Sequence, residues 1–171
     1  LHFSENPTEV ARRSGISPAA FFENYYATNH PVVLTDVVEK WEARHWTPSL
    51  LKERFGELTI EVCTDRTTDP NCDRNYKNHL TEIPMTDYVD KVLSAGESND
   101  IYLIANNQAL QRPELSSLID DIDPDPEIFD MSRVHGGASF WFGPAGTVTP
   151  LHHDVSNILF CQIYGKKRVT L

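Results

Sequence analysis

The sequence lacks an apolar run of membrane-spanning length, and its first residues have neither the charged nor the apolar region of a signal peptide. Basic residues are also few: 15 Lys and Arg against 25 Asp and Glu give a formal net charge of −10. A surface that neutralises phosphates needs a basic face. We therefore expect neither a nucleic-acid partner nor a membrane partner.

Cysteine is scarce as well. Cys63, Cys72 and Cys161 are an odd set without a Cys-x-x-Cys pair, which fits neither a disulfide framework nor a zinc knuckle. This composition favours a reducing, cytoplasmic location. Repeats and low-complexity linkers are also missing, and 171 residues bury one core of ordinary size. The sequence thus predicts a single domain over residues 1–171.

Local signals predict a mixed α/β part over residues 1–137. Ser17-Pro18 and Thr47-Pro48 each have the pattern of an N-cap followed by proline at the first helical position. Thr86 is expected to cap a third helix. Further expected elements are strands at 31–37, 58–63 and 100–105, a loop at 65–75 and a short helix at 113–122.

Residues 138–171 carry only strand signals. Short β-prone segments at 138–142, 148–154, 157–163 and 167–171 are separated by Gly or Pro turns. They predict the first strands of a jelly-roll. The expected fold class is mainly β with N-terminal helices, built on a double-stranded β-helix that is truncated after its first core strands.

The most informative segment for function is residues 147–154, with the sequence TVTPLHHD. Side chains alternate sides along an extended segment, so His152 and Asp154 point the same way while His153 points the other. One imidazole and one carboxylate can therefore meet on a single metal ion. Two His and one carboxylate form the ligand set of non-haem Fe(II) oxygenases, and this segment supplies two of the three. For His153 we expect a packed or solvent-facing side chain.

Lys167 is the second candidate. By the same alternation it shares a strand face with Val169 and Leu171, which are apolar and expected to point inward. An inward ammonium group among apolar neighbours needs an anion. The alternative is a solvated lysine on an edge strand.

A longer pattern surrounds these residues. Residues 138–154, ASFWFGPAGTVTPLHHD, and residues 160–167, FCQIYGKK, resemble the iron-binding core of JmjC-type 2-oxoglutarate oxygenases. Within that superfamily the chain is most similar to the cupin-like protein hydroxylases. Residues 31–37 and 46–51 resemble the N-terminal region of the same group, so the resemblance covers nearly the whole chain.

The resemblance implies Fe(II) as the metal, 2-oxoglutarate as cosubstrate and O2 as the oxidant. His152 and Asp154 are then the metal ligands and catalytic residues. Lys167 matches the family position that binds the distal carboxylate of 2-oxoglutarate, and Thr149 and Tyr102 match positions whose hydroxyls bind the same carboxylate.

Two further positions carry alternatives. Trp141 matches an aromatic that lines the pocket of close relatives, but it is also compatible with sheet core. Many relatives carry a cosubstrate-binding Asn where Ile158 stands here, and Asn157 lies one residue earlier. A shift of one residue turns a strand side chain to the opposite face, so either Ile158 replaces that contact or a bulge brings Asn157 round.

The family's third metal ligand is a His on a later strand, and we expect it beyond Leu171. Because residue 1 is Leu rather than Met and Leu171 falls within a predicted strand, we expect the chain to be either a fragment or a natural truncation, and to be inactive alone.

The implied activity is hydroxylation of a protein side chain, with a protein or peptide as substrate. Histone lysine demethylation is less favoured, and a homodimer stays open. One rival is a non-catalytic cupin-like binding module. The other is a cupin metalloenzyme that does not use 2-oxoglutarate, which would leave Lys167 unexplained. The acidic stretch at 120–127 favours a solvated loop over a surface that steers a basic substrate.

Overall fold

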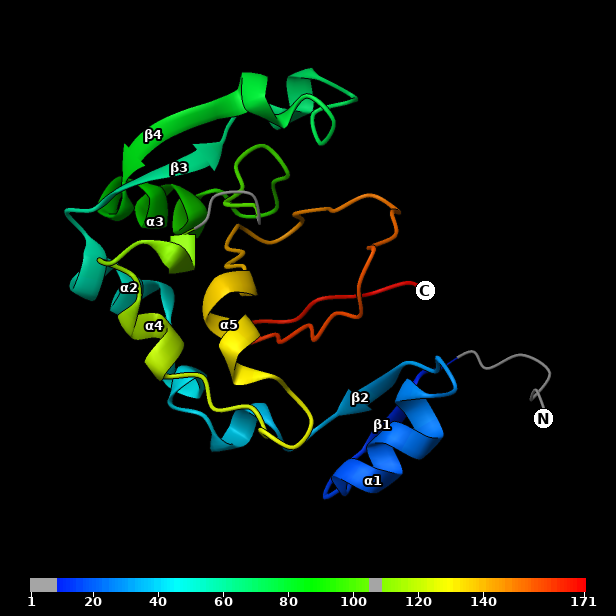
Figure 1. The fold of residues 1–171 in the computed structure, drawn as a ribbon. Helices are drawn as coiled ribbons and strands as arrows, with labels where there is room; N and C mark the ends of the chain where they lie inside the picture. Colours follow the sequence, from blue (N-terminus) through cyan, green and yellow to red (C-terminus); the bar gives the residue numbers. More distant parts are fainter. Residues whose placement is uncertain (1–8, 105–108) are drawn as a thin grey trace.

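A computed structural model of the chain describes residues 9–104 and 109–171. Its strands form two small sheets, in which β1 (Ala11–Arg13) pairs in parallel with β2 (Val32–Leu34) and β3 (Thr59–Cys63) pairs antiparallel with β4 (Leu80–Pro84). In Figure 1 the β1–β2 pair lies at one end of the molecule and the β3–β4 pair at the other. The segment after α5 runs between these two ends as extended chain.

The α-helices are short, and two of them begin where the sequence predicts. The α-helices of the described residues are α1 (Pro18–Phe21), α2 (Pro48–Phe55), α3 (Met85–Ser94), α4 (Ser117–Asp120) and α5 (Met131–Gly137). The Ser17 hydroxyl accepts the Ala20 N–H at 3.3 Å, and the Thr47 hydroxyl accepts the Leu50 N–H at 3.1 Å. Both predicted N-caps are therefore confirmed.

Helical turns of other types connect these elements. A π-helical turn, η1 (Phe22–Tyr26), continues α1, and the remaining turns are 3-10: η2 (Val38–Lys40), η3 (Glu42–His45), η4 (Arg66–Thr68), η5 (Tyr76–His79) and η7 (Ala109–Gln111). The predicted loop at 65–75 is thus largely confirmed, with η4 as a single turn inside it.

The predicted cap of the third helix is wrong by two positions. The helix α3 begins at Met85 with Pro84 in the cap position, so Thr86 lies inside its first turn. The Thr86 N–H instead donates to the carbonyl of Gly56 at 3.0 Å. A Cβ on Gly56 would lie 2.5 Å from the Thr86 hydroxyl oxygen, so the close contact between α2 and α3 requires a glycine there. This tertiary contact, which local sequence does not encode, sets the start of α3.

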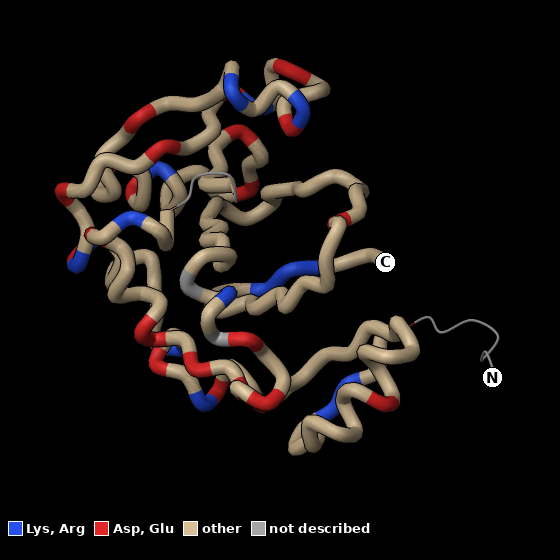
Figure 2. Tube along the Cα trace, viewed as in Figure 1, with Lys and Arg blue, Asp and Glu red and all other residues tan. Residues whose placement is uncertain are grey.

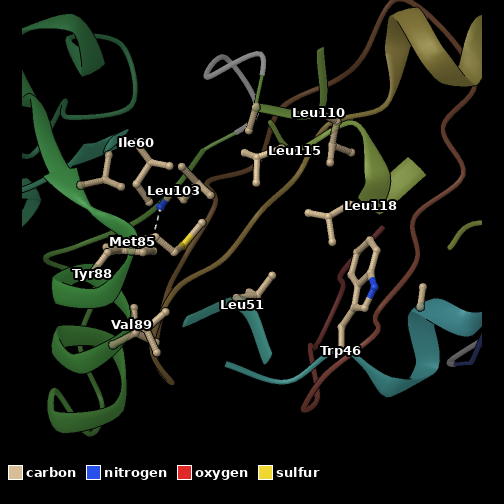
Figure 3. Close-up of a cluster of buried hydrophobic side chains, with 14 of the residues drawn as sticks. Trp46, Leu51, Ile60, Met85, Tyr88, Val89, Leu103, Leu110, Leu115 and Leu118 are labelled. Carbon is tan, nitrogen blue, oxygen red and sulfur yellow. Dashed lines mark hydrogen bonds between the residues drawn. The ribbon is translucent and has the colours of Figure 1, made fainter. Parts of the chain in front are cut away.

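One hydrophobic core packs β3 and α3 against the α2 and α4 regions (Figure 3). From β3 and α3 it receives Ile60, Val62, Met85, Tyr88 and Val89, which are all buried. Trp46 and Leu51 come from the α2 region, and Leu115 and Leu118 come from the α4 region. The burial of Ile60 and Val62 between exposed Thr59 and Glu61 follows the strand alternation.

Asp121 gives the acidic stretch a structural role. Its carboxylate accepts the Trp46 indole N–H at 2.8 Å and pairs with Arg54 at 3.1 Å, and its carbonyl accepts the Ala43 N–H at 2.9 Å. This residue therefore fastens α4 to η3 and α2. Figure 2 shows acidic residues along the segment from α4 to α5, while a run of Lys and Arg lies near the C-terminal end.

The strands predicted for residues 138–171 are extended chain rather than hydrogen-bonded ladders. Within this range the structure has only the isolated bridges Leu103↔Phe142 and Glu97↔Ala145. The predicted strand at 100–105 is likewise reduced to bridges at Tyr102 and Leu103, and Ala105 is outside the described residues. A ladder needs a partner along its whole length, and Leu151, Val155 and Ile158 are exposed here. The helix α5 was not expected either, since only strands were predicted after the acidic stretch.

Tyr88 holds two of these extended segments together. Its buried hydroxyl donates to the carbonyl of Phe142 and accepts the Leu103 N–H at 2.9 Å. Burial raises the pKa of Tyr88, so the hydroxyl keeps the proton that it donates. The neighbours of Phe142 and Leu103 in sequence are Trp141 and Tyr102, so Tyr88 fixes the spacing of two candidate site residues.

We expect Tyr88→Phe to destabilise the domain by about 1–2 kcal/mol, because it removes two hydrogen bonds of the hydroxyl, although the Leu103 N–H still donates to the Phe142 carbonyl at 2.9 Å. Denaturant unfolding of the full-length protein measures this as a lower midpoint at unchanged slope. Tyr26→Phe is the matched control, since Tyr26 is half-exposed and its replacement should cost less than about 0.5 kcal/mol. Equal midpoints for the two variants would contradict the role of Tyr88.

None of the helices within residues 9–104 and 109–171 is both long and apolar enough to cross a bilayer.

Candidate cosubstrate and metal site

Tyr102 forms the floor of the candidate site. Its backbone N–H and carbonyl both bond to Cys63 at 2.9 Å, which attaches it to the end of β3, and only 3% of the residue is exposed. A Cβ on Gly143 would lie 2.7 Å from the Tyr102 ring, so the glycine of the Trp-Phe-Gly-Pro motif makes room for this ring. The Trp141 ring packs against the Tyr102 ring, with the two ring centroids 5.5 Å apart.

Lys167 reaches this aromatic cluster from the end of the chain. Its ammonium nitrogen donates to the Tyr102 hydroxyl at 3.0 Å and lies 5.5–5.7 Å from the ring centroids of Tyr102, Trp141 and Phe160. These rings stabilise the cation from several sides. Among the residues that the structure describes, no carboxylate lies within ion-pair distance of Lys167. We call Lys167, Tyr102, Trp141 and Phe160 the lysine cluster.

The chemistry of this cluster suits a carboxylate. The Tyr102 hydroxyl oxygen accepts a hydrogen bond from the Lys167 ammonium group, so the hydroxyl proton is free for another acceptor. An ammonium group and a hydroxyl 3.0 Å apart can therefore both donate to one carboxylate group. The residues present fit the distal carboxylate of 2-oxoglutarate.

His152 and Asp154 lie together, as the alternation predicts. The His152 Nε2 and the Asp154 carboxylate oxygen are 3.7 Å apart, and both side chains are about half exposed. The His152 Nδ1 lies 2.8 Å from the carbonyl of Pro150, and a carbonyl only accepts, so Nδ1 carries the proton. The Nε2 lone pair is then directed away from the backbone, and a carbonyl that accepts from the other ring nitrogen is typical of a metal-ligating histidine.

The pair fits two positions of a first-row metal site. One nitrogen and one carboxylate oxygen suit Fe(II). Within residues 9–104 and 109–171 no group of three or more His, Cys, Asp or Glu could hold a metal ion. The third ligand expected beyond Leu171 stays a prediction.

Among the described residues, the cysteines belong to no group of side chains that could hold a metal ion. All three are free, and burial raises the pKa of Cys63 and Cys161 to about 11 and that of Cys72 above its usual value. A thiol must lose its proton to bind a metal or attack a substrate. At neutral pH these three stay protonated.

Other predicted residues lie outside the lysine cluster. Thr149 is half-buried and Asn157 is exposed, and among the described residues neither forms a hydrogen bond with Lys167. The expected inward packing of Val169 and Leu171 is wrong: they are 59% and 81% exposed, because no second layer covers this segment. Ile158, at the family's Asn position, is 61% exposed.

Two residues of the site were not anticipated. Phe160 was not singled out, although its parity is opposite to that of Cys161 and Ile163, which pack against the core. Sequence alternation alone could therefore have indicated that the Phe160 side chain points away from the core-facing side chains of Cys161 and Ile163. Arg66 lies 5.1 Å from the centroid of the Tyr102 ring and donates to the carbonyl of Val148 at 3.2 Å. Nothing in the polar loop around Arg66 distinguishes it by sequence.

Comparison with known proteins decides the family. A family model described as a cupin-like domain matches residues 18–171. The chain belongs to the cupin-like domain family. This family implies a jelly-roll β fold, of which the structure shows small sheets and the extended segments after α5.

Curated relatives place the chain among JmjC-type oxygenases. It is 32% identical to "Lysine-specific demethylase JMJ30" of Arabidopsis thaliana over 95% of the chain and 37% of that protein. It is 25% identical to human "Bifunctional peptidase and (3S)-lysyl hydroxylase JMJD7" over 88% of the chain and 50% of that protein. A Drosophila melanogaster relative, "2-oxoglutarate and iron-dependent oxygenase JMJD4 homolog", is 29% identical over 54% of the chain and 25% of that protein.

These matches confirm the resemblance to JmjC-type oxygenases, a family that depends on Fe(II), 2-oxoglutarate and O2. The chain spans half or less of the length of these three relatives.

Proposed function

We propose that the full-length protein is an Fe(II)- and 2-oxoglutarate-dependent oxygenase that hydroxylates a side chain of a protein or peptide. The observation that carries the proposal is the Lys167 ammonium beside the Tyr102 hydroxyl, with no carboxylate among the described residues to neutralise it. Lys167 is exposed rather than inward-facing as expected from the alternation, but its ammonium group bonds to the buried Tyr102, and a dicarboxylate cosubstrate would supply a counter-ion at that point.

Each residue has a separate task in this proposal. Lys167 and Tyr102 would bind the distal carboxylate and so orient the 2-oxo acid, and His152 and Asp154 would supply two ligands of the metal. Trp141 and Phe160 keep the ammonium group in place and limit its contact with water. When bound, the metal lets 2-oxoglutarate and O2 react to succinate and CO2, with the second oxygen atom inserted into a substrate C–H bond.

The direct test is turnover by the full-length protein. We expect succinate to form only when Fe(II), 2-oxoglutarate and O2 are all present, and formation to stop when a chelator removes the metal. A non-catalytic binding module would form no succinate under any of these conditions. A cupin metalloenzyme of another reaction type would turn over without 2-oxoglutarate.

The nature of the product distinguishes hydroxylase from demethylase. Hydroxylation leaves a stable gain of one oxygen atom on a peptide, whereas demethylation of a methylated lysine releases formaldehyde and leaves a loss of one methyl group. We expect the oxygen to be retained. Mass spectrometry of candidate peptides after turnover measures both outcomes, and formaldehyde release with methyl loss would favour the activity named for the Arabidopsis relative.

A further inference from the structure

Arg66 is a buried cation whose charge is only partly neutralised. Its side chain is 2% exposed, and Nη2 donates to Asp73 at 3.1 Å and to the carbonyl of Val148 at 3.2 Å. Nε and Nη1 are buried and have no hydrogen-bond partner among the described residues. Burying a guanidinium group in this state opposes folding. Stability alone therefore does not account for Arg66.

Arg66 contacts both Tyr102 and the segment that leads to the His-x-Asp pair. Its guanidinium carbon lies 5.1 Å from the centroid of the Tyr102 ring, and the Lys167 ammonium lies 5.6 Å from the same centroid. Arg66 Nη2 also donates to the carbonyl of Val148, the residue before Thr149. The Val148 N–H donates to the Asn99 side chain at 2.8 Å, so this peptide segment is held at both its N–H and its carbonyl.

We propose that Arg66 is a positioning residue for the 2-oxoglutarate pocket, which rests on the proposed function. It holds the Tyr102 ring through its guanidinium face and the start of the His-x-Asp segment through Nη2. It also adds a buried positive charge on the Tyr102 ring that Lys167 contacts. In a water-poor interior such a charge acts over several ångströms, so its removal weakens binding of the distal carboxylate even without direct contact.

The experiment compares two 2-oxo acids in the full-length protein. Calorimetric titration with Mn(II) in place of Fe(II) measures binding of 2-oxoglutarate and of 2-oxobutyrate, which lacks the distal carboxylate. For Arg66→Met we expect the Kd of 2-oxoglutarate to rise about tenfold or more, as when a charged contact is lost. The Kd of 2-oxobutyrate should change less than about twofold, because this ligand makes no use of the distal site.

Arg54 offers a matched control. It also forms an arginine–aspartate pair, with Asp121 at 3.1 Å, and its guanidinium carbon lies 5.1 Å from the centroid of an aromatic ring, that of Phe55. These contacts lie between α2 and α4 and involve no candidate site residue. Arg54→Met should lower stability while leaving both Kd values within about twofold of the wild-type values.

Each outcome decides the proposal. If the wild-type protein binds 2-oxoglutarate and Arg66→Met binds it with the same Kd, the role of Arg66 is overturned and the proposed function stands. A wild-type protein that does not bind 2-oxoglutarate would overturn both. Equal weakening toward both 2-oxo acids would show a merely structural role. If Arg66→Met does not fold, Arg66→Lys decides: it keeps the charge and loses the planar fork, so an intermediate rise in Kd for 2-oxoglutarate alone supports the role and a wild-type Kd overturns it.

Discussion

Asp154→Ala in the full-length protein is expected to abolish 2-oxoglutarate consumption and to weaken Fe(II) binding by at least about a hundredfold. The carboxylate supplies both a negative charge and a fixed ligand position, and its oxygen lies 3.7 Å from the His152 Nε2 that would share the metal. Losing only a hydrogen-bond partner of a metal ligand costs about 10–100-fold in metal affinity, so losing a direct ligand should cost no less. Anaerobic titration with Fe(II) and a succinate assay measure the two effects.

His153→Ala is the matched control for this prediction. His153 is the exposed neighbour that alternation places on the opposite side of the segment. Its removal should leave iron affinity and turnover close to wild type. If Asp154→Ala consumed 2-oxoglutarate at the wild-type rate, the metal assignment of this segment would be wrong.

Lys167→Ala should raise the KM for 2-oxoglutarate by about 10–100-fold while changing iron affinity little. The substitution removes the ammonium group that bonds to the Tyr102 hydroxyl at 3.0 Å, and with it one charge-assisted contact to the distal carboxylate. Because this contact is made in the ground state and the transition state alike, kcat at saturating cosubstrate should fall much less than kcat/KM.

Lys166→Ala serves as the control for Lys167→Ala. It removes the same charge one residue away, on an exposed side chain that shares no contact with the lysine cluster among the described residues. Its KM for 2-oxoglutarate should match the wild-type value. Parallel loss of iron and cosubstrate binding in Lys167→Ala would instead indicate general misfolding of the C-terminal segment.

Elements with strong local signals were predictable from sequence. The starts of α1 and α2 follow from Ser17-Pro18 and Thr47-Pro48, since a cap and a first-turn proline act within four residues. The strand β3 follows from the alternation of Ile60 and Val62. The start of α3 was misplaced because the contact of Thr86 with Gly56 spans thirty residues of sequence.

Elements that depend on distant partners were not predictable in this way. The parallel pairing of β1 with β2 joins Ala11 to Val32, and short segments such as these have little pattern of their own. The same distinction between local and distant contacts applies to the candidate site. Alternation places His152 beside Asp154, whereas Arg66 acquires its position only by meeting Val148, 82 residues later.

The three tryptophans differ sharply in their contact with water. Trp41 and Trp46 are 2% and 6% exposed, whereas Trp141, in the lysine cluster, is 39% exposed. Indole fluorescence shifts to longer wavelengths when the ring meets water, and a dissolved quencher reaches an exposed ring before a buried one. The long-wavelength part of the emission from this chain therefore reports mainly on Trp141. The protein thus carries a built-in optical reporter at the place where a cosubstrate is expected to bind.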